Sequence, residues 1–258
     1  MLFDTHVHLL SDKFNEDRED VLAALPGNGI GLALEAGCDV ECSQQCVSLC
    51  EKYPFLYGSA GIHPHDAKGY QAGDMEKLEK ILQHPKMMAV GEIGLDHHYD
   101  FSPRDVQKKV FELQLELAVQ TKKPVIIHSR EAAKETMDLL CVYYKRLTGG
   151  VMHCYSGSVE TAKQYLDMGF YISFSGSVTF TNAVTPKEVA AMVPLDRILV
   201  ETDCPYLTPV PHRGKRNEPK YVRHVAEEVA RIKGLTFEEI EEATYNNGKR
   251  FLKLIINS

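Results

Sequence analysis

Residues Leu2–Leu9 read LFDTHVHL, and the rest of the sequence can be interpreted outward from this stretch. Its apolar residues predict a buried strand, and side chains along a strand alternate between its two sides. His6 and His8 should therefore point to the same side, where both imidazoles can face one metal ion. A pair of hydrogen-bonded core histidines explains this pattern equally well, so the interpretation depends on the remaining strands.

Apolar, β-branched runs alternate with segments of helical periodicity along the whole sequence. Eight strands alternating with helices predict a (β/α)8 TIM-type barrel of the α/β class. No linker or low-complexity segment interrupts the alternation, so we expect residues 1–258 to form a single domain. The predicted strands are Leu2–Leu9, Ile30–Ala36, Leu56–Ile62, Met87–Leu95, Pro124–His128, Val151–Tyr155, Tyr171–Ser175 and Ile198–Thr202.

The clearest helix signal follows Ser102-Pro103, where serine is the expected N-cap and proline the expected first helical residue. The apolar positions that follow recur every three or four residues and predict one buried helix face. These positions are Val106, Val110, Leu113 and Leu117.

Active sites of such barrels lie at the carboxyl ends of the strands, and this sequence places metal-ligand residue types there. A doubly wound sheet would also alternate strands and helices, but no glycine-rich phosphate turn follows the first strand. The candidate ligands, each in or directly after a predicted strand, are His6, His8, Glu92, His128, His153 and Asp203.

Six ligands are too many for one open catalytic ion, and they suit two divalent ions that share a carboxylate. Imidazole and carboxylate donors fit Zn²⁺ or Mn²⁺, and a carboxylate-rich part fits Mg²⁺. Glu92 is central in strand order and is the expected bridge. One ion would take His6, His8, Glu92 and Asp203, and the other would take Glu92, His128 and His153.

Three of the residues at the predicted strand ends have possible roles in catalysis or substrate binding. Asp203 can accept a proton from a water whose pKa a metal ion has lowered. His63 and His65 lie outside the ligand count. We expect His63 to contact the substrate or protonate a leaving group, and His65 either to bind substrate or to support its neighbours.

Basic residues gather in the proline-rich loop that follows the eighth predicted strand. Arg213, Lys215 and Arg216 lie there in a protein whose formal net charge is −7. A charge cluster of this kind is usually a solvated surface, but its place after a ligand-bearing strand favours phosphate binding. Arg130, two residues after His128, is a second candidate phosphate contact.

Composition limits the possible functions. At 258 residues and 44% hydrophobic content the chain can bury a large core, and its acidic balance argues against broad adhesion to nucleic acid or anionic membrane. No apolar run reaches the roughly 20 residues of a membrane span, and the first residues lack a secretory signal pattern. The seven cysteines include no Cys-x-x-Cys pair, so we expect reduced thiols in a cytoplasmic protein. We expect a monomer without an obligate protein partner.

The combined motifs resemble the TatD family of metal-dependent deoxyribonucleases, which belongs to the amidohydrolase-like barrels. The resemblance runs in order over nearly the whole chain and implies a divalent-metal hydrolase of DNA phosphodiesters with the ligand division given above. The motifs are His6-x-His8, Gly61-Ile62-His63-Pro64-His65, Gly91-Glu92-Ile93-Gly94-Leu95-Asp96, His128-Ser129-Arg130, His153-Cys154-Tyr155-Ser156-Gly157, Glu201-Thr202-Asp203-Cys204-Pro205-Tyr206-Leu207 and Arg213-Gly214-Lys215-Arg216-Asn217.

The leading hypothesis is an enzyme that cleaves DNA phosphodiester bonds with a metal-activated water, and trimming of DNA ends is one form this could take. One alternative is a barrel hydrolase of a small amide, lactone or phosphoester. Such barrels often bridge their metals with a carbamylated lysine on the fourth strand, and no lysine lies between Met88 and Asp96. The other is a non-catalytic nucleic-acid-binding protein with structural metals, although structural sites are usually closed and cysteine-rich.

Overall fold

The computed structural model describes residues 1–254 and places eight strands in one sheet. The strands follow one another in chain order from β1 to β8, which confirms the predicted (β/α)8 barrel. Their observed bounds are β1 Leu2–Val7, β2 Ile30–Glu35, β3 Leu56–Ala60, β4 Met87–Asp96, β5 Val125–Arg130, β6 Gly150–Met152, β7 Tyr171–Phe174 and β8 Ile198–Val200.

Two compact units make up the chain. The terminal unit comprises Met1–Glu35 and Cys154–Ser258, and the central unit comprises Ala36–His153. The single domain predicted over residues 1–258 stays a prediction, and its last four residues lie outside the described part of the chain.

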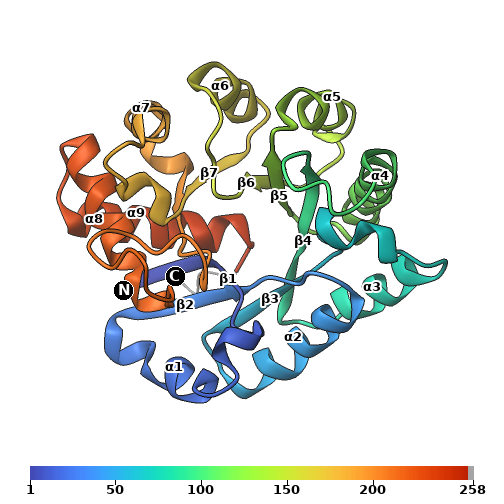
Figure 1. Cartoon of the computed structure of the whole chain (residues 1–258), viewed down its shortest axis with the longest axis horizontal. Coiled ribbons are helices and arrows are strands. Elements are labelled where there is room, and N and C mark those ends of the chain that lie inside the picture. The colour runs from blue at the N-terminus through green and yellow to red at the C-terminus, as the bar shows by residue number, and fades with distance from the viewer. Residues whose placement is uncertain (255–258) are drawn as a thin grey trace. The chain divides into compact units, whose positions relative to one another are not determined.

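The terminal unit contains β1, β2, β7 and β8, and α8 and α9 pack against β1 and β8 (Figure 1). Val7 bridges Cys204, so the end of β1 lies beside the segment after β8. α9 approaches β1 closely at Gly248, where an added Cβ atom would lie 2.5 Å from the Phe3 ring. The helices of this unit are α1 Arg18–Ala24, α6 Val159–Asp167, α7 Val184–Met192, α8 Val222–Lys233 and α9 Phe237–Phe251.

The central unit contains β3 to β6, and successive strands of this set pair in parallel. Gly94 on β4 lies opposite His128 on β5 and has a φ of +148°. A Cβ atom at position 94 would lie 2.0 Å from the carbonyl oxygen of His128, so this close approach of β4 to β5 requires glycine. The helices of this unit are α2 Val40–Lys52, α3 Asp74–Leu82, α4 Arg104–Thr121 and α5 Ala133–Tyr143.

Two details of α4 differ from the sequence-based expectation. Pro103 itself is the N-cap, whereas the Ser102 hydroxyl is buried and bonds to backbone groups of His65 and Lys68. The buried face is also shifted, because it includes Gln107 and Gln114. Both amides bind backbone groups at the ends of β4 and β3, and Val106 and Leu113 are only half-buried. Periodicity of apolar residues could not reveal a face made by buried glutamines.

Within residues 1–254, no helix combines the length and apolar character that a membrane span needs.

Candidate metal centre

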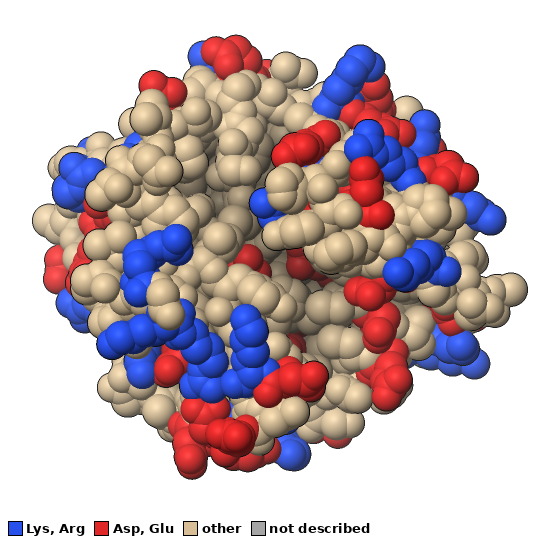
Figure 2. Space-filling model, viewed as in Figure 1, with Lys and Arg blue, Asp and Glu red and all other residues tan. Residues whose placement is uncertain are grey.

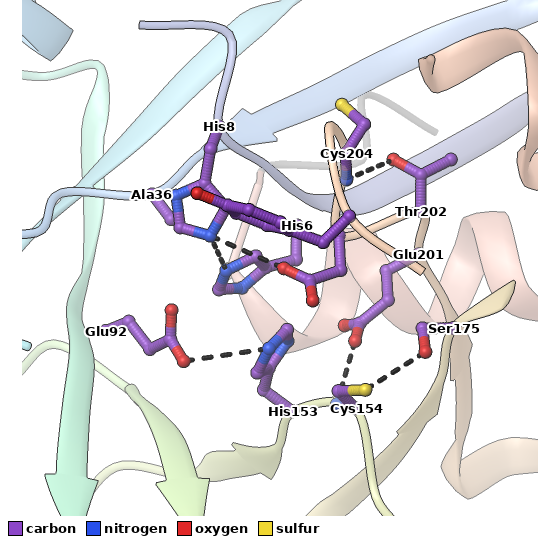
Figure 3. Close-up of polar contacts among 12 residues, drawn as sticks. His6, His8, Ala36, Glu92, His153, Cys154, Ser175, Glu201, Thr202 and Cys204 are labelled. Carbon is purple, nitrogen blue, oxygen red and sulfur yellow. Dashed lines mark hydrogen bonds and ion pairs between the residues drawn. The ribbon is translucent and has the colours of Figure 1, made fainter. Parts of the chain in front are cut away.

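The first group of candidate ligands lies in the terminal unit and consists of His6, His8 and Asp203. The Nε2 atoms of His6 and His8 face each other at 3.1 Å (Figure 3). His8 Nε2 lies 3.4 Å from an oxygen of Asp203. This confirms that the two-residue period of the strand turns both imidazoles to one side. Two Nε2 atoms at this distance must share either a proton or a cation.

Backbone contacts between the ends of β1 and β8 fix these three side chains. The Asp203 N–H donates to the carbonyl of His6, and the His8 N–H donates to the carbonyl of Cys204. Asp203 has a φ of +57°, a left-handed conformation that aspartate tolerates better than most residues. The buried Asp4 carboxylate accepts hydrogen bonds from the backbone and hydroxyl of Thr202, which holds the residue before Asp203 in place.

Glu201 is a buried carboxylate that the sequence interpretation did not select. One of its oxygens accepts the backbone N–H of Cys154 at 2.7 Å, and the other accepts the Ser173 hydroxyl at 2.6 Å. Cys154 has a φ of +44°, and its Sγ lies 3.0 Å from the hydroxyl of Ser175 (Figure 3). Glu201 therefore fixes the strained residue that follows His153 in the chain.

The second group lies in the central unit around Glu92, a buried residue of β4. One carboxylate oxygen, Oε1, lies 2.7 Å from Nδ1 of His128, 3.5 Å from Nε2 of His63 and 3.6 Å from Nε2 of His153. Two of these histidines were predicted ligands, and His63 was predicted to act on the substrate. The structure thus brings His63 into the same group as Glu92 and His128.

The protonation of His63 follows from its surroundings. Its Nδ1 accepts the backbone N–H of His65 at 3.2 Å, so a neutral ring carries its proton on Nε2, toward Glu92. Burial lowers the pKa of His63 to about 4, despite the nearby Glu92 carboxylate. With its proton on Nε2, the neutral imidazole can donate a hydrogen bond at pH 7, but it is a poor acid for a leaving group.

Asp96, the last residue of β4, supports this group and was not among the predicted site residues. Its Oδ2 lies 2.8 Å from Nε2 of His65 and 3.2 Å from Nε2 of His128. Its Oδ1 accepts the backbone N–H groups of His98 and Tyr99. Burial raises the pKa of Asp96, but hydrogen bonds from His128, Tyr99 and His65 together outweigh it and hold the pKa well below the usual range.

His128 therefore lies between two carboxylates. Burial lowers its pKa, but hydrogen bonds to Asp96 and Glu92 outweigh this effect and raise the pKa above the usual value. A histidine held by a carboxylate on one nitrogen, with the other nitrogen aimed at a second group, is a common arrangement in metal sites. Asp96 thus orients His128 Nδ1 toward Glu92.

Both groups fit divalent metal ions. Donor atoms about 2.1 Å from one ion lie roughly 3.0–3.4 Å apart in octahedral or tetrahedral geometry. The donor pairs His6–His8 and His8–Asp203, at 3.1 and 3.4 Å, match this spacing. In the second group, His153–Glu92 at 3.6 Å is close to it, whereas His128–Glu92 at 2.7 Å is the distance of a direct hydrogen bond. Imidazole and carboxylate together are the donor types of Zn²⁺ and Mn²⁺ sites.

The predicted phosphate-binding residues of the terminal unit have different surroundings. Figure 2 shows basic side chains gathered on part of the face drawn, with acidic ones beside them. Arg216 is half-buried and makes a two-pronged ion pair with Asp17, at 2.6 and 2.7 Å. Arg213 and Lys215 are exposed, and the Arg213 guanidinium lies 3.8 Å from the centre of the Phe180 ring. Arg216 therefore has a structural partner, whereas Arg213 and Lys215 are open to solvent.

In the central unit, Arg130 and His65 lie in one neighbourhood. Arg130 is exposed, with its guanidinium 4.8 Å from the centre of the Tyr99 ring, and the His65 ring meets Tyr99 edge-on at 5.3 Å.

Comparison with known proteins identifies the family. The family model described as TatD related DNase matches residues 3–253. The chain belongs to the TatD family. It is 43% identical over 254 residues to the uncharacterized metal-dependent hydrolase YabD of Bacillus subtilis, covering 98% of this chain and 100% of that protein. It is also 31% identical to the 3'-5' ssDNA/RNA exonuclease TatD of Salmonella typhimurium, covering 98% and 100% of the two chains.

The TatD homologue YjjV of Escherichia coli has a solved structure that superimposes on this chain with a TM-score of 0.92. The two are 29% identical, and the match covers 98% of each chain. The protein is therefore a metal-dependent hydrolase of the TatD family with the fold of its relatives.

Proposed function

We propose that this TatD-family hydrolase cleaves phosphodiester bonds of DNA with two divalent metal ions. One ion is held by His6, His8 and Asp203, and the other by Glu92, His128 and His153, with Glu92 as the predicted bridge. The main support is the Glu92 carboxylate oxygen, which has three imidazole nitrogens within 3.6 Å. Buried carboxylate and imidazole groups converge in this way where they share protons or cations.

Bound ions would activate water and neutralise charge on a phosphoryl oxygen. The chain's own residues would supply the remaining functions. Asp203 has one oxygen near His8 and would accept the proton of the attacking water. Neutral His63 would donate a hydrogen bond to substrate from Nε2, and His65 would bind substrate. The exposed side chains of Arg130, Arg213 and Lys215 would contact flanking phosphates, and Arg216 would do so less well because Asp17 holds it.

The Salmonella relative is named as a 3'-5' exonuclease of single-stranded DNA and RNA, which supports a nuclease that works from chain ends. The competing function is hydrolysis of a small amide, lactone or phosphoester, and non-catalytic nucleic-acid binding is the second competitor. β4 offers Glu92 where many such small-molecule barrels would use a carbamylated lysine, which favours the nuclease. The choice among Mg²⁺, Mn²⁺ and Zn²⁺, the monomeric state and the cytoplasmic location stay predictions.

The test compares purified protein on single-stranded DNA, RNA, a small generic phosphodiester and a lactone, with and without each divalent ion. We expect metal-dependent shortening of DNA that exceeds the rate on the lactone. Hydrolysis of the lactone or an amide with no attack on DNA or RNA would overturn the proposal in favour of the first competitor. Binding of DNA without hydrolysis of any substrate would favour the second.

A further inference from the structure

Tyr99 and Phe101 form an exposed pair of aromatic rings in the loop between β4 and α4. Their centroids are 5.2 Å apart and their planes differ by 22°, so the rings are stacked. Tyr99 is 47% exposed and Phe101 is 55% exposed. Two large rings held parallel in solvent expose apolar surface that a folded chain ordinarily covers, and such a patch commonly marks a binding site.

The backbone of this loop is held at both ends. The Tyr99 N–H donates to the Asp96 carboxylate, and the Ser102 hydroxyl donates to the carbonyl of His65. The buried Gln107 amide donates to the carbonyl oxygens of Asp96 and Ser102. The loop that carries the rings is therefore held in place, so that less conformational entropy of the loop is lost when a ligand binds.

A cation and a third ring lie beside the pair. The His65 ring meets Phe101 edge-on at 4.9 Å, and the Arg130 guanidinium lies 4.8 Å from the centre of the Tyr99 ring. Within residues 1–254, no carboxylate oxygen lies within 4 Å of the Arg130 guanidinium nitrogens. The nearby acidic groups have other partners, because Asp100 pairs with Arg104 and Glu131 contacts His98. Arg130 can therefore receive an anion.

The ring pair is connected to the candidate metal ligands through one carboxylate. Asp96 binds the backbone of Tyr99 with one oxygen and lies 3.2 Å from His128 with the other. The opposite nitrogen of His128 lies 2.7 Å from Glu92. Asp96 and His128 therefore link the Tyr99 backbone to Glu92 within the central unit.

We propose that Tyr99 and Phe101 form a stacking platform for a nucleobase of single-stranded nucleic acid, with Arg130 holding the adjoining phosphate. This inference rests on the proposed nuclease function and names the part of the substrate that the platform recognises. Aromatic rings stack on every base, so the platform favours unpaired strands without selecting a sequence. A base in the interior of a duplex is already stacked on both faces and is not available.

The size of the patch favours a base over a protein partner. Each aromatic side chain offers at most about 250 Å². A stable protein interface needs about 800 Å² from each partner. Two rings and one arginine fall short of that area, whereas they match one nucleotide, which presents a flat apolar base and a single negative charge.

The sequence contains no tryptophan, so Phe101→Trp places the only tryptophan of the chain at the platform, and tryptophan emission reports on that position. A phosphorothioate single strand of thymidines, which resists hydrolysis, should quench this emission as it binds. A strand of equal length and charge with abasic sugars should not quench it. Phe101→Leu keeps an apolar side chain but cannot stack, and should weaken binding of the thymidine strand by about 5- to 100-fold, measured by fluorescence anisotropy. Its affinity for the abasic strand should not change.

Val142→Ala is the matched control, because Val142 is an exposed apolar residue of α5, 68% exposed, and its loss should change neither affinity. Wild-type binding of the thymidine strand with no quenching in Phe101→Trp and no loss in Phe101→Leu overturns the platform and leaves the nuclease intact. Absence of any wild-type binding or cleavage of nucleic acid overturns both. An altered sedimentation coefficient in Phe101→Leu with unchanged strand binding overturns the platform in favour of self-association.

Discussion

Asp96→Asn replaces one oxygen of a buried carboxylate by an amino group with almost no change in size. The remaining oxygen can keep the two backbone N–H groups that Asp96 binds. The amino group then faces Nε2 of His65 and Nε2 of His128, which lie 2.8 and 3.2 Å from the present oxygen. An amino group only donates, so Nε2 of His128 must accept and the ring proton moves to Nδ1, the atom that faces Glu92.

The magnitude follows from this change of tautomer. A protonated Nδ1 cannot bind an ion, and loss of a carboxylate behind a ligating histidine typically costs 10- to 100-fold in metal affinity or turnover. We expect Asp96→Asn to fall in that range. One charge-assisted hydrogen bond contributes about 1.5–3 kcal/mol, so Tm should drop by roughly 3–12 °C in a chain of this length.

Calorimetric titration with Mn²⁺ measures the metal affinity, and thermal unfolding measures the stability. Asp100→Asn is the matched control, since Asp100 lies in the same loop but is exposed and pairs with Arg104. It should bind metal as the wild type does. If Asp96→Asn folds, binds Mn²⁺ with wild-type affinity and keeps wild-type turnover, the assigned role of Asp96 is wrong.

Four further substitutions test individual residues. Glu92→Gln should lower occupancy of both ions and reduce turnover by about 10²-fold or more, and two full ions with normal turnover would exclude a bridge. Asp203→Asn keeps an oxygen ligand but removes the proton acceptor, so turnover at saturating metal should fall about 10²-fold; an unchanged rate would leave Asp203 a ligand at most. Arg213→Ala should raise KM for oligonucleotides by about 5- to 100-fold with little change in kcat. Arg216→Ala should mainly lower Tm, because it breaks the ion pair with Asp17. A raised KM in Arg216→Ala together with a lowered Tm in Arg213→Ala would contradict the roles assigned to the two arginines.

Much of the fold was predictable because the strands are apolar, β-branched and regularly spaced. The alternation of strand and helix predicted the barrel, and the two-residue period predicted that His6 and His8 converge, as their 3.1 Å separation confirms. These inferences need only local periodicity and a general rule about where parallel strands end.

Other features depend on contacts between residues distant in sequence. Asp96 lies in a motif that the sequence interpretation quoted, but nothing local indicates that it meets both His65 and His128. Glu201 is next to Thr202 in sequence, yet its partners are Cys154 and Ser173. Arg213 and Arg216 look equivalent in sequence, but Arg216 pairs with Asp17 whereas the Arg213 guanidinium lies over the Phe180 ring.

The most direct test of the account counts and locates the metal ions. Crystals grown with Mn²⁺ should show two anomalous peaks per chain at the manganese edge. One should lie against His6, His8 and Asp203, and the other against Glu92 and His128. Elemental analysis in solution should give two ions for the wild type and one for His8→Ala or for His128→Ala. No ion at either group, or ions bound only to other residues in an active enzyme, would contradict the account.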